Sequence, residues 1–319
     1  MSQQIANQLH KDGFINKKHH QLLTAIYSKK VYSLYYEHKS ILLVGVISLA
    51  TGLGLWIYKN VGSIGHQVIL GSITALTFTC FWYVTKKREP LRSDKVQTPG
   101  LFYDYVLLLG CLLFLTLESY LEFQYSIFQE RWDIWALIPA LMFFYLAYVH
   151  DHQGVLTMAI TGLTSWVGIN ATPKAVLAGE LFADLDFVVT GIFYSLFLTV
   201  FALILNKVGL KRHFTFTYLN FGANLLSISI LYGLFNKSQD WLYFLLLLFA
   251  CVSFFYYARK QTSFVFLLYS SLYGYTGLSY LILKNIHQDS TVVFLYFTIS
   301  AGLMVLFLFN YKKIFKLIS

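Results

Sequence analysis

Apolar segments about as long as a lipid bilayer is thick recur along the chain, and they restrict its possible folds more than any other feature. The first begins at Ile41 and the last ends near Phe309. Of the 319 residues, 57% are hydrophobic and 12% are charged, whereas a typical soluble domain has about 25% charged residues. This composition excludes an ordinary water-soluble enzyme, a coiled coil and a disordered chain. The sequence predicts an all-α fold, a polytopic integral membrane bundle.

About ten transmembrane helices are expected from the apolar segments. Each has a length of roughly 24–33 Å at about 1.5 Å per residue, which matches one hydrocarbon layer. The predicted spans are Ile41–Tyr58, Val68–Val84, Leu101–Leu121, Trp132–Val149, Gly154–Ile169, Phe187–Leu205, Phe214–Phe235, Trp241–Ala258, Phe264–Leu283 and Thr291–Phe309. The fourth and fifth spans are separated by a very short turn at Asp151 and His152, so we expect them to form a hairpin.

The basic residues are distributed unequally between the two sides that ten spans define. Of the 24 Lys and Arg residues, 19 lie in the N-terminal segment, the C-terminal tail and every second loop. The other five lie singly in the remaining loops, at Lys59, Arg131, Lys174, Lys237 and Lys284. Since cytoplasmic loops are enriched in Lys and Arg, this partition predicts that both termini are cytoplasmic.

Four regions follow from these spans. We expect residues 1–40 to form a cytoplasmic amphipathic helical segment, 41–170 a first transmembrane half, 171–186 an external interfacial helix, and 187–319 a second half with a short basic tail. Four lysines of the N-terminal segment predict contact with anionic lipid headgroups, with a docking surface for a cytosolic protein as the alternative. They are Lys17, Lys18, Lys29 and Lys30. The net charge of +9 does not indicate a nucleic-acid partner, because the basic residues lie beside the spans.

Three acidic residues in the third span are the candidate functional acids. Asp104, Glu118 and Glu122 lie on one helix face, because residues 18 apart coincide in angle at 100° per residue. Asp104 and Glu122 are about 27 Å apart along the axis, near opposite headgroup layers, so only Glu118 is expected well inside the membrane. Either all three mark the polar edges of the span, or Glu118 is a carboxylate that binds an ion or a proton.

No catalytic, cofactor-binding or metal site is predicted. The sequence His150-Asp151-His152 offers only part of a metal site, so we interpret it as a solvated turn. The three cysteines lie singly in apolar segments, which is typical of packing residues. Phosphate-binding loops, dinucleotide-binding glycine motifs, nucleophile elbows and zinc-protease motifs are absent from the sequence.

Small residues four apart in the first two spans predict close helix packing. The candidate packing residues are Ser48, Gly52, Gly54 and Gly71. Two alternatives remain open: they pack the first span on the second within one chain, or they form the seam of a homo-oligomer or of a complex with a membrane partner.

The N-terminal part also carries a pattern known from a protein family. Asp12-Gly13-Phe14-Ile15 precedes a first span with Gly45, Gly52 and Gly54, and Asn60 follows shortly after it. This pattern resembles the bacterial multi-pass membrane proteins called domain of unknown function 2157, over roughly residues 5–170. The resemblance implies a multi-pass protein of the bacterial inner (plasma) membrane, and it carries no assigned activity or catalytic residues.

These observations favour a non-enzymatic integral membrane protein that acts as a scaffold, assembly or envelope-maintenance factor through lipid and partner contacts. A transporter or permease for a small or lipidic solute, using Glu118, is the alternative. A membrane-embedded enzyme on lipid substrates is a third possibility. The second half has no ionisable residue inside its spans and shows no similarity to the first half, which is less typical of an ion-coupled carrier.

Overall fold

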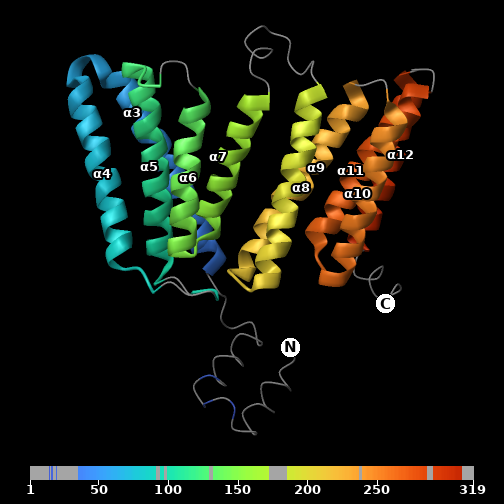
Figure 1. Ribbon diagram of the computed structural model, residues 1–319, viewed down its shortest axis with the longest axis horizontal. Coiled ribbons are helices and arrows are strands. Elements are labelled where there is room, and N and C mark those ends of the chain that lie inside the picture. Colours follow the sequence, from blue (N-terminus) through green and yellow to red (C-terminus); the bar gives the residue numbers. More distant parts are fainter. Residues whose placement is uncertain are drawn as a thin grey trace. The chain divides into compact units, whose positions relative to one another are not determined.

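The computed structural model describes residues 14, 16, 19, 35–90, 94–96, 99–128, 132–171, 185–236, 239–285 and 290–310. Ten long helices and one short 3-10 helix, η1 (Arg212–Phe214), make up the regular structure of these residues, which contain no strand (Figure 1). The helices are α3 (Tyr35–Ile64), α4 (His66–Lys86), α5 (Leu101–Tyr125), α6 (Trp132–His150), α7 (Gln153–Ala171), α8 (Leu185–Val208), α9 (Thr215–Asn236), α10 (Asp240–Gln261), α11 (Phe264–Asn285) and α12 (Ser290–Phe309). Each corresponds to one predicted span, so the all-α membrane bundle is confirmed.

Seven of these helices are long and apolar enough to cross a membrane by themselves. The other three, α6, α7 and α11, have 19 to 22 residues. Helix α6 contains a shorter apolar stretch, Ile134–His150. Hydroxyl-bearing residues and glycines interrupt the apolar sequences of α7 and α11. Most of the predicted amphipathic segment, 1–40, and of the predicted interfacial helix, 171–186, lies outside the described residues, although residues 35–40 already belong to α3.

The chain divides into two compact units. Unit 1 comprises Met1–Val84 and Gly100–Leu113, and unit 2 comprises Thr85–Pro99 and Phe114–Ser319. In unit 1 the Tyr105 hydroxyl of α5 donates a hydrogen bond to the Lys39 carbonyl of α3, at 2.7 Å. Gly110 of α5 lies directly against α4, where an added Cβ would be 3.0 Å from the Phe81 ring. Whether residues 41–170 and 187–319 act as two halves stays a prediction.

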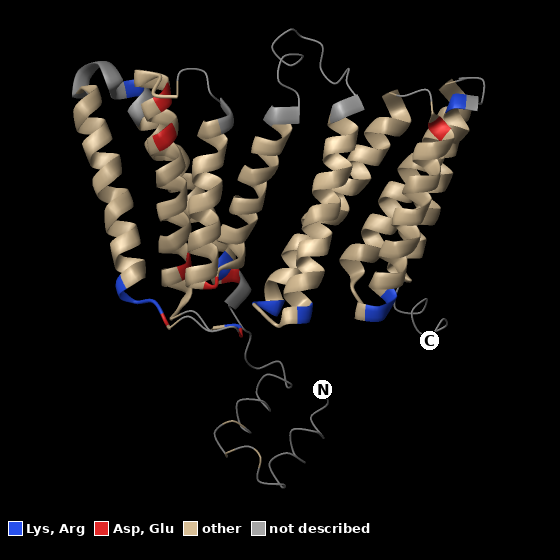
Figure 2. Ribbon diagram, in the orientation of Figure 1, with Lys and Arg blue, Asp and Glu red and all other residues tan. Residues whose placement is uncertain are grey.

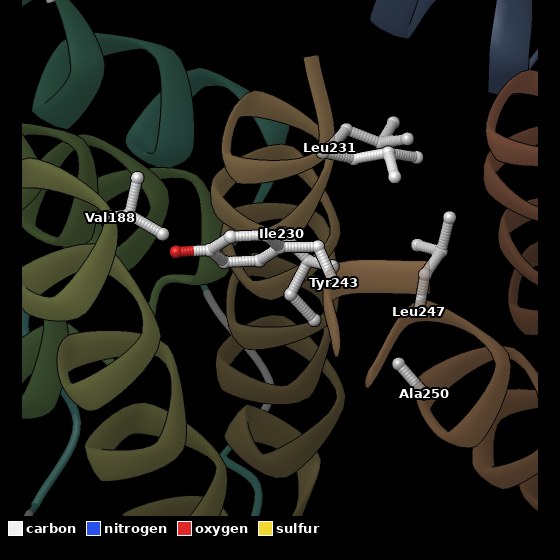
Figure 3. Packing of buried hydrophobic residues seen from close by; sticks show 7 residues of the cluster. Val188, Ile230, Leu231, Tyr243, Leu247 and Ala250 are labelled. Atoms are coloured by element: carbon white, nitrogen blue, oxygen red, sulfur yellow. The ribbon is translucent and has the colours of Figure 1, made fainter. Parts of the chain in front are cut away.

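In unit 2, α6 packs on α7, α8 on α9, and α10 on both α9 and α11. The core at the α8–α9–α10 junction consists of Val188, Ile230, Leu231, Leu234, Tyr243, Leu247 and Ala250 (Figure 3). Figure 3 shows the Tyr243 ring of α10 pointing toward Val188 of α8. Gly233 of α9 makes room for this ring, because a Cβ at Gly233 would lie only 2.4 Å from it. The core therefore depends on glycine where a large side chain crosses a neighbouring helix.

The described charged residues of α8, α10 and α11 lie in the terminal turns of these helices (Figure 2). The membrane orientation predicted from the charges is tested by reporter fusions. A reporter fused after Lys95 or after Arg212 should signal a cytoplasmic position, and one fused after Arg131 or after Lys237 the opposite side, because the basic loops stay in the cytoplasm. Alkaline phosphatase and fluorescent-protein fusions measure this directly. A cytoplasmic signal after Lys237 would contradict the predicted topology.

Candidate functional site

The three candidate acids all lie on α5, at different depths. Asp104 is in the first turn, where the helix dipole favours a negative charge. Glu118 lies about 7.5 Å from the middle of α5 along the axis, well within a hydrocarbon half-thickness of about 15 Å. Glu122 is in the last turns of the helix. One helix carries the acids, but it does not bring them together as one site.

Glu118 is the acid whose burial requires an explanation. The residue is 6% exposed, and its Oε1 has no hydrogen-bond partner among the described residues. A buried carboxylate without a partner is strongly disfavoured in its charged form. This Oε1 is therefore open to a proton, an ion or a donor from outside the described residues.

Glu122, in contrast, has a structural role. Its Oε2 accepts a hydrogen bond from the Phe128 backbone N–H at 2.9 Å, and its carbonyl accepts one from Ser126 N–H at 2.9 Å. Ser126 has a positive φ of 45°, as expected for the residue that ends a helix and reverses the chain. Glu122 thus closes the turn that follows α5.

Tyrosine hydroxyls form a ladder of hydrogen bonds between the helices of unit 2. Tyr269 and Tyr273 of α11 donate to the side-chain oxygens of Asn220 and Asn224 of α9, at 2.5 and 2.6 Å. These two asparagines therefore bond across helices. Further rungs are Tyr148–Tyr218, Thr164–Tyr194, Ser279–Tyr296 and Tyr275–Ser300. The polar groups of these spans therefore have one another as partners.

A groove of about 250 Å³ lies between α6 and α7, and Leu115 of α5 contributes to its wall. Its lining is apolar apart from Thr157, Thr161 and Ser165 of α7. Each of these hydroxyls donates to the carbonyl four residues earlier in α7, at 2.9–3.0 Å. Their polarity is satisfied within the helix, so the groove suits an apolar occupant.

The interpretation of His150-Asp151-His152 as a solvated turn is wrong. Asp151 is buried and has a positive φ of 55°, and its carboxylate accepts hydrogen bonds from Val96 N–H at 2.5 Å and from His213 Nε2 at 2.6 Å. Lys211 Nζ lies 3.2 Å away, and the side chains of Asp151 and Lys211 are each 4% exposed. The partners come from segments about 60 residues apart in sequence, which short-range sequence patterns do not reveal. We call Asp151, Lys211, His213 and Val96 the Asp151 cluster.

The predicted packing residues of α3 and α4 have open space around them among the described residues, and their role in packing stays a prediction. Nothing lies within 4 Å of a Cβ added at Gly52, Gly54 or Gly71, and Ser48 is exposed. The closest helix approaches occur in the second half instead. A Cβ at Gly222 of α9 would lie 3.1 Å from the Ser195 carbonyl oxygen of α8. An interface with another chain at Ser48, Gly52, Gly54 and Gly71 stays a prediction.

Among the described residues, no group of three or more His, Cys, Asp or Glu side chains could hold a metal ion.

The comparison with known protein families gives a match for the N-terminal part of the chain. Residues 7–156 match the family described as predicted membrane protein (DUF2157), as the sequence pattern predicted. No match was found among curated proteins or among solved structures.

Proposed function

We propose that the chain is a non-enzymatic scaffold of the bacterial inner membrane, with a role in assembly or envelope maintenance through contacts with lipid and partner proteins. The observation that supports this most is the hydrogen-bond ladder. Carriers and membrane enzymes direct polar side chains into a cavity or onto a substrate. Here Asn220 and Asn224 bind Tyr269 and Tyr273 and so fix α11 on α9.

Two surfaces would serve as contacts of the scaffold. Helix α3 has no buried residue in its apolar window, Glu37–Trp56, so its Ser48, Gly52 and Gly54 are available to a second copy or to a membrane partner, together with Gly71 of α4. Small residues let helix backbones approach closely, which supports this assignment. The lysines of the N-terminal segment would bind anionic lipid headgroups.

Glu118→Gln tests the scaffold against the carrier. Glutamine keeps the shape and the hydrogen-bonding capacity of the side chain but removes the titration. In a scaffold this variant should fully complement a strain that lacks the gene, and its melting temperature should be unchanged or slightly raised, since a buried ionisable group is removed. Complementation and thermal melting of the purified protein measure both effects.

A second variant in the same experiment, Asn224→Leu, tests the role of the hydrogen-bond ladder. It leaves the Tyr273 hydroxyl without its acceptor and should destabilise unit 2 by about 1–2 kcal/mol. If the ladder serves a scaffold, complementation should fall in step with the amount of folded protein. Ser253→Ala is the control, because among the described residues the Ser253 hydroxyl bonds only the Phe249 carbonyl of its own helix.

A transporter or permease is the second candidate, and one observation favours it. Glu118 is buried at hydrocarbon depth with an oxygen that lacks a partner among the described residues. Such a carboxyl is what a proton- or ion-coupled carrier requires. A Glu118→Gln protein that is folded, inserted and wholly inactive in the complementation assay would overturn the scaffold proposal in favour of the carrier.

A further inference from the structure

The Asp151 cluster joins three segments at one end of unit 2. Asp151 lies in the turn between α6 and α7, Val96 in the segment before α5, and Lys211 and His213 in the connection from α8 to α9. The Gln153 side chain adds a hydrogen bond to the His213 carbonyl at 3.1 Å. Both Asp151 and Lys211 have positive φ, 55° and 47°. Residues other than glycine adopt this conformation at a cost, so the contacts of these two side chains must stabilise it.

Two histidines beside Asp151 are placed so that their neutral forms fit the closed cluster. His152 Nδ1 accepts a hydrogen bond from the Val155 backbone N–H at 3.1 Å, which caps the first turn of α7. Only an unprotonated Nδ1 can accept this bond, so protonation of His152 removes the cap. His150 is the last residue of α6, beyond the predicted span, and it is 6% exposed.

Burial, together with the positive charge of Arg88, lowers the pKa of His150 from 6.5 to about 4. Because this folded-state pKa lies below the ordinary value, the stabilisation from a neutral His150 is complete above about pH 6.5 and decreases as the pH falls toward 4. The imidazole of the opened turn binds its proton more tightly. Acid therefore favours opening.

Other charged groups lie around the turn. His213 Nε2 donates to Asp151 Oδ1 at 2.6 Å. Lys211 Nζ lies 3.2 Å from the same carboxylate, so Asp151 faces two basic side chains. The positive charge of Arg88 disfavours a further positive charge on His150, and the Arg212 guanidinium lies beside Gly209.

We propose that the Asp151 cluster is an acid-sensitive latch. At neutral pH it holds the α6–α7 turn, residues 94–96 and the α8–α9 connection together. It releases them as His150 and His152 become protonated. The physical basis is one buried carboxylate that three donors share, flanked by two imidazoles whose neutral forms fit the closed arrangement.

Hydrogen exchange of the full chain in lipid nanodiscs tests the latch. Exchange is measured at about pH 7.5 and about pH 5 and corrected for the intrinsic pH dependence. In the wild type, the protection of peptides from the α6–α7 turn and from the α8–α9 connection should fall by about tenfold at the lower pH. The double variant His150→Gln, His152→Asn should keep its protection, because asparagine caps a helix at either pH.

Three comparisons keep the test decisive. His38→Gln removes an exposed histidine of α3 and should behave as the wild type. Peptides from α10 and α11 should be equally protected at both pH values. Should the double variant fold poorly, His152→Asn alone should lose less protection than the wild type. Equal wild-type protection at both pH values, an unchanged loss in the His150 and His152 variants, or a loss that extends over α10 and α11 would overturn the latch.

Discussion

Asp151→Ala should lower the free energy of unfolding of unit 2 by about 3–5 kcal/mol, the usual effect of removing one partner from a buried ion pair. The reason is that Lys211 and His213 would remain buried without their acceptor, and Val96 N–H would lose its partner too. Alanine also tolerates the left-handed backbone at position 151 poorly. Unfolding of the detergent-solubilised protein with increasing SDS or urea measures the change.

Two variants separate the causes of this loss. Asp151→Asn keeps an acceptor and favours the left-handed conformation, so it should be less destabilising than alanine although the negative charge is gone. Asp240→Ala removes the partner of Lys284 in an ion pair that is much more exposed, and it should change stability far less. If Asp151→Ala and Asp240→Ala had equal effects, the burial of the Asp151 cluster would not matter for stability.

Gly222→Leu should be comparably damaging, for a purely steric reason. Already the first carbon of a side chain at Gly222 would lie 2.6 Å from Thr199 Oγ1 and 3.1 Å from the Ser195 carbonyl oxygen. The hydroxyl can rotate, but the backbone of α8 must move away from α9. Such overpacking costs about 1–3 kcal/mol or more. Thermal melting monitored by size-exclusion chromatography should show a lower midpoint and less folded protein.

Gly302→Leu is the matched control. Gly302 lies in α12, and nothing in the described chain is within 4 Å of a Cβ added there. The same substitution should therefore leave the melting midpoint nearly unchanged. Equal destabilisation by both variants would mean that the loss arises from an effect common to both sites, such as impaired insertion, and not from the contact between α8 and α9.

The fold could be predicted from the sequence because lipid imposes a simple requirement on it. A chain segment that crosses hydrocarbon must satisfy its own backbone hydrogen bonds, so apolar length alone indicates a helix. Each of the ten predicted spans corresponds to a helix. Asn220 and Asn224 were also predictable as cross-helix partners, because amides inside a span need donors and acceptors on a neighbouring helix.

Much of the site was not predictable, because it depends on contacts between distant segments. The sequence shows Asp151 between two histidines, but not that Lys211 and His213 fold over it. Similarly, the spacing of small residues drew attention to Gly52 and Gly71, whereas Gly222 lies where helices actually meet closely. Helix rotation and register decide these contacts, and hydropathy contains little information on either. The sequence does contain one sign that Asp151 is buried, because a charged residue lies in a turn too short to extend into solvent.

Helix α7 is poorly suited to enter a bilayer alone. It carries Thr157, Thr161, Thr164 and Ser165, and it is not among the helices apolar enough to span by themselves. Its hydroxyls donate to carbonyls of the previous turn, which reduces the penalty in lipid but only once the helix has formed. Since only Asp151 and His152 separate α7 from α6, we expect the two helices to enter the membrane together as one hairpin, with the more apolar α6 assisting α7. The short turn would then couple the insertion of the two helices.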